Sequence, residues 1–211
     1  MNLSHIRKDY SGKALRETEV EKNPVLQFKI WFEEALNAEV EEANAFSLAT
    51  CGKNMHPSVR TVLLKEFDER GFVFCTNYES RKGIQLFENP NAAAVFFWRE
   101  LMRQVKIEGS VEKVSTAESE NYFHARPVEA QVGATISRQS TALDSREWLD
   151  EKFQEALQKF SAAKVDLPEW WGGYRIIPQR IEFWQGQASR LHDRICYLKE
   201  RDRWIIQRLY P

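Results

Sequence analysis

The chain has 211 residues, enough for one good-sized domain, and its 43% hydrophobic and 29% charged content is that of an ordinary soluble protein. Its 30 lysines and arginines balance 31 acidic residues, and this formal net charge of -1 argues against a dedicated nucleic-acid binder. Three cysteines without zinc-like spacing predict neither a disulfide framework nor a metal site, and together with the lack of an apolar leader or spanning segment they favour a cytoplasmic protein away from membranes.

The predicted elements describe one domain. Residues 1–22 are polar with little periodicity and are predicted to form a mobile arm. Pro24 opens a pattern with helical spacing. The remaining elements are strands at 45–50, 58–64, 71–76, 92–98 and 101–114, a helix at 80–87, helices at 116–125, 128–137 and 146–160, and strands at 174–184, 190–199 and 204–209. Strands from both halves of the chain predict a single domain over 23–211, an α+β and mainly antiparallel β fold shaped like a barrel with helices outside.

The segment 184–194, which joins two apolar strands, is the most informative part of the chain. Strand alternation places Arg190, His192 and Arg194 on one face. Unpaired cations in apolar surroundings usually have an anionic partner, and only Asp193 and Glu182 are close in sequence. We interpret the row as a site for an anionic small molecule, with a solvated edge strand as the alternative.

A second cationic pattern begins a predicted helix. Ser80 is suited to cap this helix, but Arg81 and Lys82 occupy its first turn, where acidic residues are preferred. Such a helix start binds phosphate readily. The alternative is that both side chains bend away into water.

Three other segments carry weaker signals. Arg60 and Lys65 bracket an apolar strand, and the polar stretch 137–140 follows a predicted helix. Tyr122 and Arg126 are spaced to share one helix face, which suits either a phosphate monoester or a surface stacking pair. The sequence has no acid–base dyad, Ser/His/Asp set, P-loop or GxGxxG motif, so a cofactor is expected to supply the chemistry.

Taken together, these segments resemble the pyridoxamine 5'-phosphate oxidase family, flavin enzymes of vitamin B6 metabolism. The resemblance runs through nearly the whole chain in order. Its motifs are Arg7-Lys8-Asp9-Tyr10, Arg60 through Lys65, Thr76-Asn77 with Ser80-Arg81-Lys82, Arg103-Gln104-Val105, Tyr122 through Pro127, Gln139-Ser140, Trp171-Gly172-Gly173, and Ile181 through Gln185 with Arg190 through Arg194.

The resemblance implies an FMN-binding split β-barrel with peripheral helices, acting as a homodimer with FMN at two sites built from both subunits. The implied cofactor-binding positions are Arg60, Thr61, Val62, Leu63, Leu64, Lys65, Cys75, Thr76, Arg81, Lys82, Gln104, Gln139, Ser140, Trp184 and Arg194, of which Cys75 either touches the flavin or only packs beside it. The implied substrate-binding positions are Lys65, Tyr122 and Arg126 on the phosphate, Ala130 beside them, Arg190, Leu191 and His192 over the pyridine ring, and Arg7, Lys8, Asp9 and Tyr10 in an arm that folds over the site as a lid. Arg190 and His192 are the implied catalytic residues.

The implied reaction is oxidation of pyridoxine or pyridoxamine 5'-phosphate to pyridoxal 5'-phosphate by O2, with release of H2O2 and, from the amine, NH3. The alternatives are another split-barrel flavin oxidoreductase, or a non-catalytic carrier of flavin or B6 phosphate. One position departs from the family, because Ala130 stands where a serine usually completes the substrate-phosphate pocket. A lost hydrogen bond to a charged group is expected to weaken substrate binding about ten- to hundredfold. Thr135 is also smaller than the aromatic residue expected there.

Overall fold

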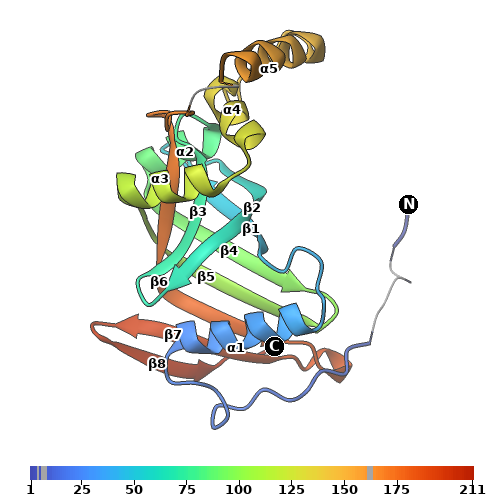
Figure 1. Ribbon diagram of the computed structural model, residues 1–211. Coiled ribbons are helices and arrows are strands. Elements are labelled where there is room, and N and C mark those ends of the chain that lie inside the picture. Colours follow the sequence, from blue (N-terminus) through green and yellow to red (C-terminus); the bar gives the residue numbers. More distant parts are fainter. Residues whose placement is uncertain (4, 6–8, 161–163) are drawn as a thin grey trace.

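The fold is seen in a computed structural model, which describes residues 1–3, 5, 9–160 and 164–211. Within these residues the strands are β1 (Ala45–Cys51), β2 (Pro57–Asp68), β3 (Gly71–Asn77), β4 (Asn91–Trp98), β5 (Arg103–Lys113), β6 (Trp171–Gln185), β7 (Asp193–Glu200) and β8 (Arg203–Arg208). They form one antiparallel sheet in the order β3-β2-β1-β4-β5-β6-β7-β8, and pairing of β3 with β6 closes six of them into a barrel (Figure 1). The predicted α+β, mainly antiparallel fold is confirmed.

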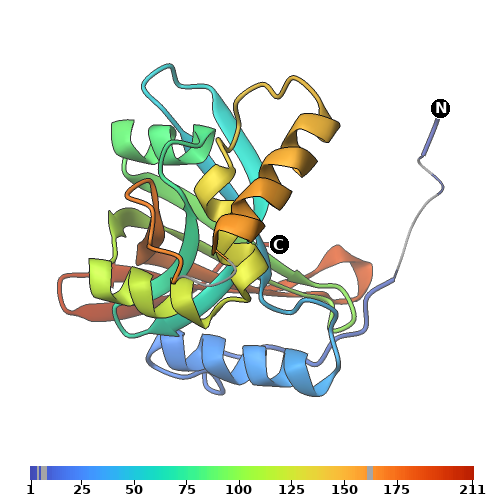
Figure 2. The ribbon, with the colours of Figure 1, turned by 45° about the horizontal axis from the view of Figure 1, so that its top comes forward.

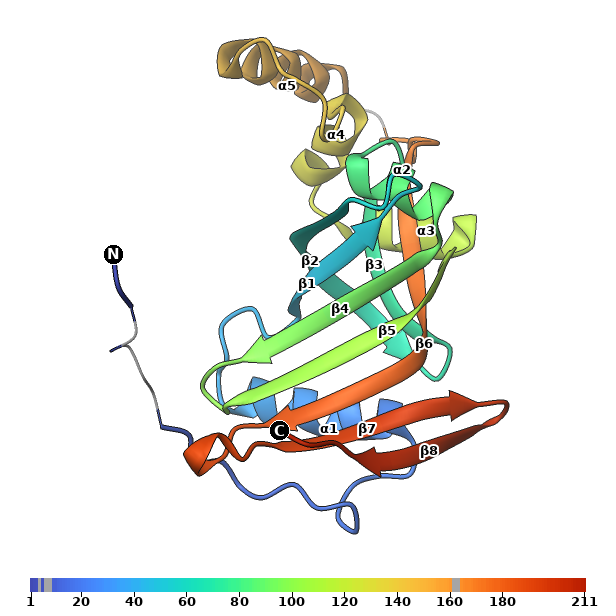
Figure 3. The ribbon, with the colours of Figure 1, turned by 180° about the vertical axis from the view of Figure 1, so that it is seen from behind.

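Strand β6 links the two ends of the molecule. Its first residues pair with β3, from Trp171 opposite Asn77 to Ile176 opposite Phe72, and so close the barrel. Its last six residues, Arg180 to Gln185, pair with β7, which continues into β8. One long strand therefore carries the barrel at one end and the β7–β8 hairpin at the other (Figure 3).

The helices cover opposite ends of the barrel. They are α1 (Pro24–Asn37), α2 (Arg81–Glu88), α3 (Thr116–Ala125), α4 (Val128–Ile136) and α5 (Arg146–Phe160). In Figures 1 and 2, α1 lies beside the β7–β8 hairpin, whereas α2 to α5 gather at the far end of the barrel. None of the helices in the described part of the chain is long and apolar enough to cross a membrane.

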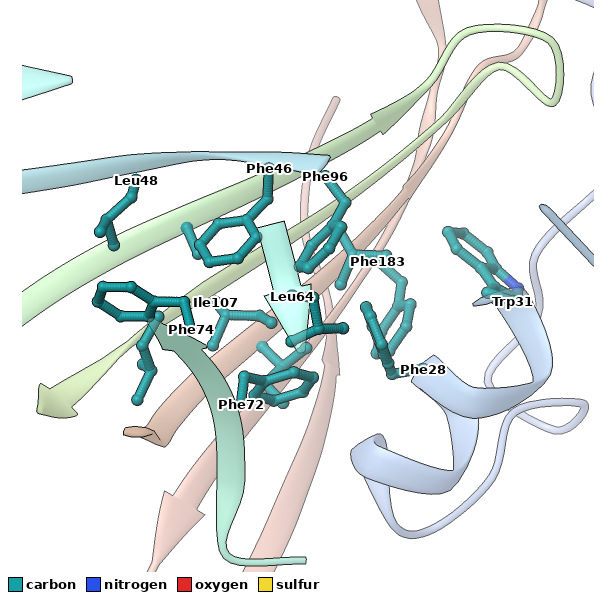
Figure 4. Close-up of a cluster of buried hydrophobic side chains, with 14 of the residues drawn as sticks. Phe28, Trp31, Phe46, Leu48, Leu64, Phe72, Phe74, Phe96, Ile107 and Phe183 are labelled. Atoms are coloured by element: carbon teal, nitrogen blue, oxygen red, sulfur yellow. The ribbon is translucent and has the colours of Figure 1, made fainter. Parts of the chain in front are cut away.

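Aromatic side chains fill the barrel. Phe28 of α1 is fully buried, and its ring lies 4.9 Å from that of Phe72 and 5.1 Å from that of Phe96 (Figure 4). Burial of each such ring contributes about 1.5–3 kcal/mol. A smaller apolar cluster, with Phe123, Val132 and Trp171 at its centre, packs α3 and α4 against the start of β6. This second cluster fixes the helices that surround the cavity described below.

The predicted strand over 190–199 is wrong at its start. Residues Ala188–Arg190 form a 3-10 turn, in which Ser189 and Arg190 have φ angles of 54° and 61°. A left-handed backbone cannot continue sheet pairing, so β7 begins only at Asp193. The expected row of Arg190, His192 and Arg194 on one strand face therefore does not exist, because only Arg194 belongs to the strand.

Candidate functional site

A cavity of about 710 Å³ opens between the barrel and its helices, within the usual size range of small-ligand sites. Strands β2 and β3 supply one wall, and α3, α4 and the segment after α4 supply the other. The lining residues are Arg60, Thr61, Val62, Leu63, Lys65, Cys75, Thr76, Asn77, Lys82, Tyr122, Arg126, Ala130, Gly133, Ala134, Ser137, Gln139 and Trp171. The structure thus brings together most of the positions expected to hold the cofactor and the substrate phosphate.

Lys82 is a buried cation at the start of α2. Ser80 caps this helix by accepting a hydrogen bond from the Gly83 N–H, which brings the next residues of the first turn under the cavity. The Lys82 side chain is only 8% exposed, and its Nζ donates to Thr76 Oγ1 at 2.9 Å and to Gln139 Oε1 at 2.6 Å. Burial and the nearby Arg60 lower the Lys82 pKa to about 8. Its acceptors are all uncharged.

Arg60, on β2, lies near Lys82 and is likewise hydrogen-bonded to uncharged groups. Its guanidinium donates to Leu48 O at 2.9 Å, Thr50 Oγ1 at 2.8 Å and Ser58 Oγ at 2.6 Å. Burial, and then the charge of Arg81, lower its pKa. No ion pair joins Arg60 or Lys82 to a carboxylate in the described residues. Two cations held by neutral groups favour a dianionic ligand such as a phosphate at this end of the cavity.

A second cationic group lies at the helical wall. Arg126 follows α3 as its C-cap, and its guanidinium sits 4.8 Å from the centre of the Trp171 ring. One of its nitrogens, Nη1, is buried without a hydrogen-bond partner, whereas Nη2 donates to Ala130 O. Burial lowers the Arg126 pKa. A buried donor left unsatisfied costs about 1–3 kcal/mol, so this nitrogen is suited to an anionic acceptor entering the cavity.

Tyr122 and Lys65 complete this second group. The Tyr122 ring stacks on Trp171, with ring centres 6.1 Å apart and an interplanar angle of 6°, and Lys65 Nζ lies 5.3 Å from the Tyr122 ring centre. Tyr122 of α3 and the C-cap residue Arg126 both line the cavity, although Arg126 lies just beyond the helix whose face was predicted to carry it. The surface-stacking alternative is therefore wrong, because their aromatic partner is Trp171 inside the cavity.

Several expected cofactor positions lie at the margin. The Leu64 side chain is 5% exposed and belongs to the barrel core, so only its backbone is available to a ligand. Arg81 is exposed, while Ser140 lies in a neighbouring pocket beside α5 with a φ of 74°. Cys75 lines the cavity itself, and burial raises the pKa of its thiol to about 12. Roles in cofactor binding for these residues stay predictions.

The remaining expected positions cluster around the β6–β7 turn. Trp184 is paired with Gln104 in the sheet, and the ring centres of Trp184 and His192 are 4.6 Å apart. His192 Nδ1 accepts a hydrogen bond from the Gln187 N–H at 3.1 Å, and burial followed by the charge of Arg190 lowers the His192 pKa. Arg190 and Leu191 are exposed.

Arg194 differs from the expectation for an unpaired cation. Its Nε donates to Glu182 Oε1 at 2.8 Å, and its Nη1 to the backbone oxygen of Tyr210 at 2.9 Å. Although burial opposes ionisation of Glu182, hydrogen bonding to Arg194 and the charge of Lys106 leave its pKa lowered. Arg194 is thus ion-paired within the chain, although Glu182 also pairs with Lys106 and Arg180.

Within one chain, the residues that line the cavity and the residues of the β6–β7 turn lie at opposite ends of β6. Trp171 in the cavity and Trp184 at the turn belong to the same strand, thirteen residues from each other. At about 3.3 Å per residue this is roughly 40 Å of strand. Among the described residues, those of the turn do not line the cavity.

The N-terminal arm reaches the β6–β7 turn through Tyr10. Of the four arm positions, Arg7 and Lys8 lie outside the described residues, Asp9 is exposed, and Tyr10 contacts Trp184 and His192 edge-on, with centre distances of 5.7 and 5.5 Å. The sequence did not single out Gly133 and Ala134 of the cavity wall, whose small side chains carry no signal of chemistry, whereas Ser137 begins the polar stretch that it did single out. Trp171 belongs to the family motif Trp171-Gly172-Gly173, but only the fold shows that its ring lies against the Arg126 guanidinium.

The sequence matches two family profiles. Residues 32–160 match the family described as "Pyridoxamine 5'-phosphate oxidase", and residues 171–211 match "Pyridoxine 5'-phosphate oxidase C-terminal dimerisation region". A curated pyridoxine/pyridoxamine 5'-phosphate oxidase of Trichormus variabilis is 54% identical over 210 residues, covering 99% of this chain and 98% of the relative. One of Aliarcobacter butzleri is 53% identical, with both chains fully covered.

Solved structures agree with the fold. PhzG from Burkholderia lata, in complex with tetrahydrophenazine-1-carboxylic acid, superposes with a TM-score of 0.90 at 30% identity, covering 95% of this chain and 100% of that one. An FMN-binding protein of Nostoc punctiforme, described as related to pyridoxamine 5'-phosphate oxidase, gives a TM-score of 0.71 at 15% identity, covering 87% and 97%. This second likeness concerns the fold alone.

Proposed function

Because the chain belongs to the pyridoxamine 5'-phosphate oxidase family, we propose that it oxidises pyridoxine 5'-phosphate and pyridoxamine 5'-phosphate to pyridoxal 5'-phosphate, with FMN as its cofactor and O2 as the electron acceptor. One observation carries the proposal beyond the family. A single cavity contains two separate groups of cations, Arg60 with Lys82 and Lys65 with Arg126, that lack carboxylate ion pairs in the described residues. Two phosphate-bearing ligands side by side are what such a cavity would hold.

The first group fits the FMN phosphate. Lys82 and Arg60 supply charge-assisted donors, and the hydroxyl of Thr76 and the amide of Gln139 already lie within hydrogen-bond distance of Lys82. Arg81 and Ser140, at the margin, are proposed to complete the phosphate site. The strand backbone at Val62 and Leu63 is placed to meet the isoalloxazine ring.

The second group fits the substrate phosphate. Arg126, Lys65 and Tyr122 all line the cavity beside Ala130, and the buried Nη1 of Arg126 has no hydrogen-bond partner in the described residues. When bound, FMN supplies hydride acceptance from the substrate carbon and transfer of the electrons to O2, which yields H2O2. The residues of this chain bind and orient the two ligands so that the reacting carbon meets the flavin.

We propose that a second copy of the chain supplies the rest of the site. The C-terminal region matches a dimerisation region, and it carries Trp184, Arg190, His192 and Arg194, with Gln104 beside it. In a homodimer these residues would reach the cavity of the partner. Trp184 and Arg194 would then touch the cofactor, whereas Arg190, Leu191 and His192 would lie over the substrate ring.

His192 and Arg190 are assigned the handling of the substrate's reacting group. Because Nδ1 of His192 accepts a hydrogen bond from the Gln187 N–H, the neutral imidazole carries its proton on Nε2. The lowered pKa keeps this neutral form at pH 7, and its Nε2–H can donate to the substrate oxygen or nitrogen. Arg190 would orient the ring. The cytoplasmic location stays a prediction.

An anaerobic titration tests the function. Purified, FMN-loaded protein is titrated with pyridoxine 5'-phosphate while the flavin absorption is recorded. We expect the flavin absorption to bleach and oxygen to restore it, with formation of pyridoxal 5'-phosphate. Titration with pyridoxamine 5'-phosphate should also release ammonia. A flavin that binds without bleaching with either substrate would favour a carrier. Bleaching by a phosphate-free carboxylic acid, such as the tetrahydrophenazine bound by PhzG, would favour another flavin oxidoreductase. Failure to bind FMN would contradict the proposal.

A further inference from the structure

The segment 10–17 is bound along the β6–β7 turn and the β7–β8 hairpin, far from it in sequence. The Gly12 N–H donates to Gly186 O at 3.1 Å, and the Leu15 N–H donates to Asp193 Oδ2 at 3.0 Å. Gln187 Nε2 donates both to Lys13 O and to Asp193 Oδ2. Leu15 is 8% exposed and joins the barrel core. The segment is therefore attached by backbone hydrogen bonds and by an apolar anchor.

An ion cluster closes over this attachment. Arg208 of β8 donates to both Glu17 oxygens, from Nε at 2.6 Å and from Nη2 at 2.8 Å. The same guanidinium donates from Nη1 to Asp193 Oδ1 at 2.6 Å and from Nη2 to Leu15 O at 2.7 Å. Hydrogen bonding from Arg208 lowers the Glu17 pKa to about 2. One arginine thus joins the arm, β7 and β8, and Asp193 directly follows His192.

The packing beneath the cluster leaves little room. A Cβ at Gly12 would lie 2.1 Å from Gln185 Nε2, and a Cβ at Gly186 would lie 2.6 Å from a ring carbon of Tyr10. Tyr10 itself stands edge-on against the rings of Trp184 and His192. Where the arm lies along the turn therefore decides where the Tyr10 ring lies.

We propose that the cluster of Glu17, Arg208 and Asp193 is a positioning device, which holds the segment 10–17 on the hairpin and so keeps Tyr10 against His192 and Trp184. Its role in the reaction rests on the proposed function, in which His192 serves the substrate. Glu17, Arg208 and Asp193 act through Tyr10 and His192 and touch no ligand themselves. Loss of the cluster frees Tyr10 and weakens substrate binding, while FMN, held by other residues, stays bound.

Glu17→Gln tests this role, because it removes the charge and keeps the size of the side chain. The matched control is Glu19→Gln in the same segment, since Glu19 forms only a longer, exposed pair with Arg16 at 3.8 Å. Both variants are compared with the FMN-loaded wild type by hydrogen exchange of the Gly12 and Leu15 amides. Because exposed ion pairs contribute modestly to stability, we expect these two amides to exchange about fivefold faster in Glu17→Gln than in the wild type. Their exchange rates should not change in the control variant.

Kinetics separate positioning from simple stabilisation. For Glu17→Gln we expect KM for pyridoxine 5'-phosphate to rise about fivefold, with kcat and FMN content unchanged. Tyr10→Ala should raise KM at least as much, and the double variant should be no worse than Tyr10→Ala alone, because Glu17 acts through Tyr10. Unchanged hydrogen exchange in Glu17→Gln would overturn the proposal. Faster exchange with an unchanged KM would also overturn it, and so would additive effects of Glu17→Gln and Tyr10→Ala on KM.

These outcomes differ from failure of the proposed function. A wild-type protein that binds FMN but oxidises no B6 phosphate would contradict the function itself, and with it the role of the cluster in the reaction. The exchange comparison would still decide whether Glu17 and Arg208 hold the segment in place.

Discussion

Replacing Lys82 by methionine is expected to stabilise the FMN-free protein and, at the same time, to weaken FMN binding. Lys82 is 8% exposed, and its pKa falls from the ordinary 10.5 to about 8. This lowering corresponds to about 3 kcal/mol, which the charged form costs the folded protein at pH 7. Methionine has a similar shape and carries no charge, so the cost disappears without leaving a large cavity.

Part of this gain is offset by lost hydrogen bonds. Lys82 Nζ donates to Thr76 and Gln139, and each bond contributes about 1 kcal/mol. The two acceptors keep a partner after the substitution, because Thr76 Oγ1 and Gln139 Oε1 lie 3.2 Å apart. We therefore expect the free energy of unfolding of the FMN-free protein at pH 7 to rise by about 1 kcal/mol.

The affinity for FMN should change in the opposite direction. A hydrogen bond from an ammonium to a phosphate contributes about 1.5–3 kcal/mol, so Kd should rise about 10- to 100-fold. Urea denaturation of the FMN-free protein measures the first effect, and flavin fluorescence titration measures the second. Lys53→Met, at an exposed lysine, should change neither. A destabilised Lys82→Met protein that binds FMN as tightly as the wild type would refute the reasoning.

Three further predictions concern pH and individual residues. Since the Lys82 pKa in the FMN-free protein is about 8, the Kd of FMN should rise above pH 8 as the ammonium loses its proton; the same titration of Lys82→Met should show no such rise, and a shared rise would assign the effect elsewhere. Ala130→Ser adds a hydroxyl beside Arg126 and should lower KM for the substrate about tenfold at constant FMN content, whereas an unchanged KM would mean that the hydroxyl does not reach the phosphate. Arg190→Ala should reduce turnover far more than bound FMN, and equal losses in activity assays and flavin content would contradict its assignment to the substrate.

The sequence predicted the elements of the barrel because period-two and helical hydrophobic patterns are local properties. Helices α3 and α5 lie where their patterns indicated, and the Ser80 cap of α2 is present. The strand predicted from residue 190 failed for an equally physical reason. Ser189 and Arg190 have a left-handed backbone although neither is a glycine, the residue that usually signals this conformation in a sequence.

The parts of the site that depend on distant contacts could not be predicted from residue patterns alone. Arg208 and Glu17 are 191 positions apart, and nothing in either neighbourhood indicates the pairing. The carboxylate partner of Arg194 is Glu182, which lies on the adjacent strand, and this contact follows from the register of β6 against β7. The family resemblance, by contrast, named both groups of site residues because it carries information about the dimer that a single chain lacks.

The thiol of Cys75 has a consequence for the lifetime of the enzyme. It lines the cavity in which hydrogen peroxide would be released, yet burial raises its pKa to about 12 against the opposing charges of Lys65 and Arg126. At pH 7 the thiol is therefore almost entirely un-ionised, and the thiolate is the form that peroxide oxidises. We therefore expect peroxide formed in this cavity to oxidise Cys75 only slowly, because the less reactive thiol form prevails there.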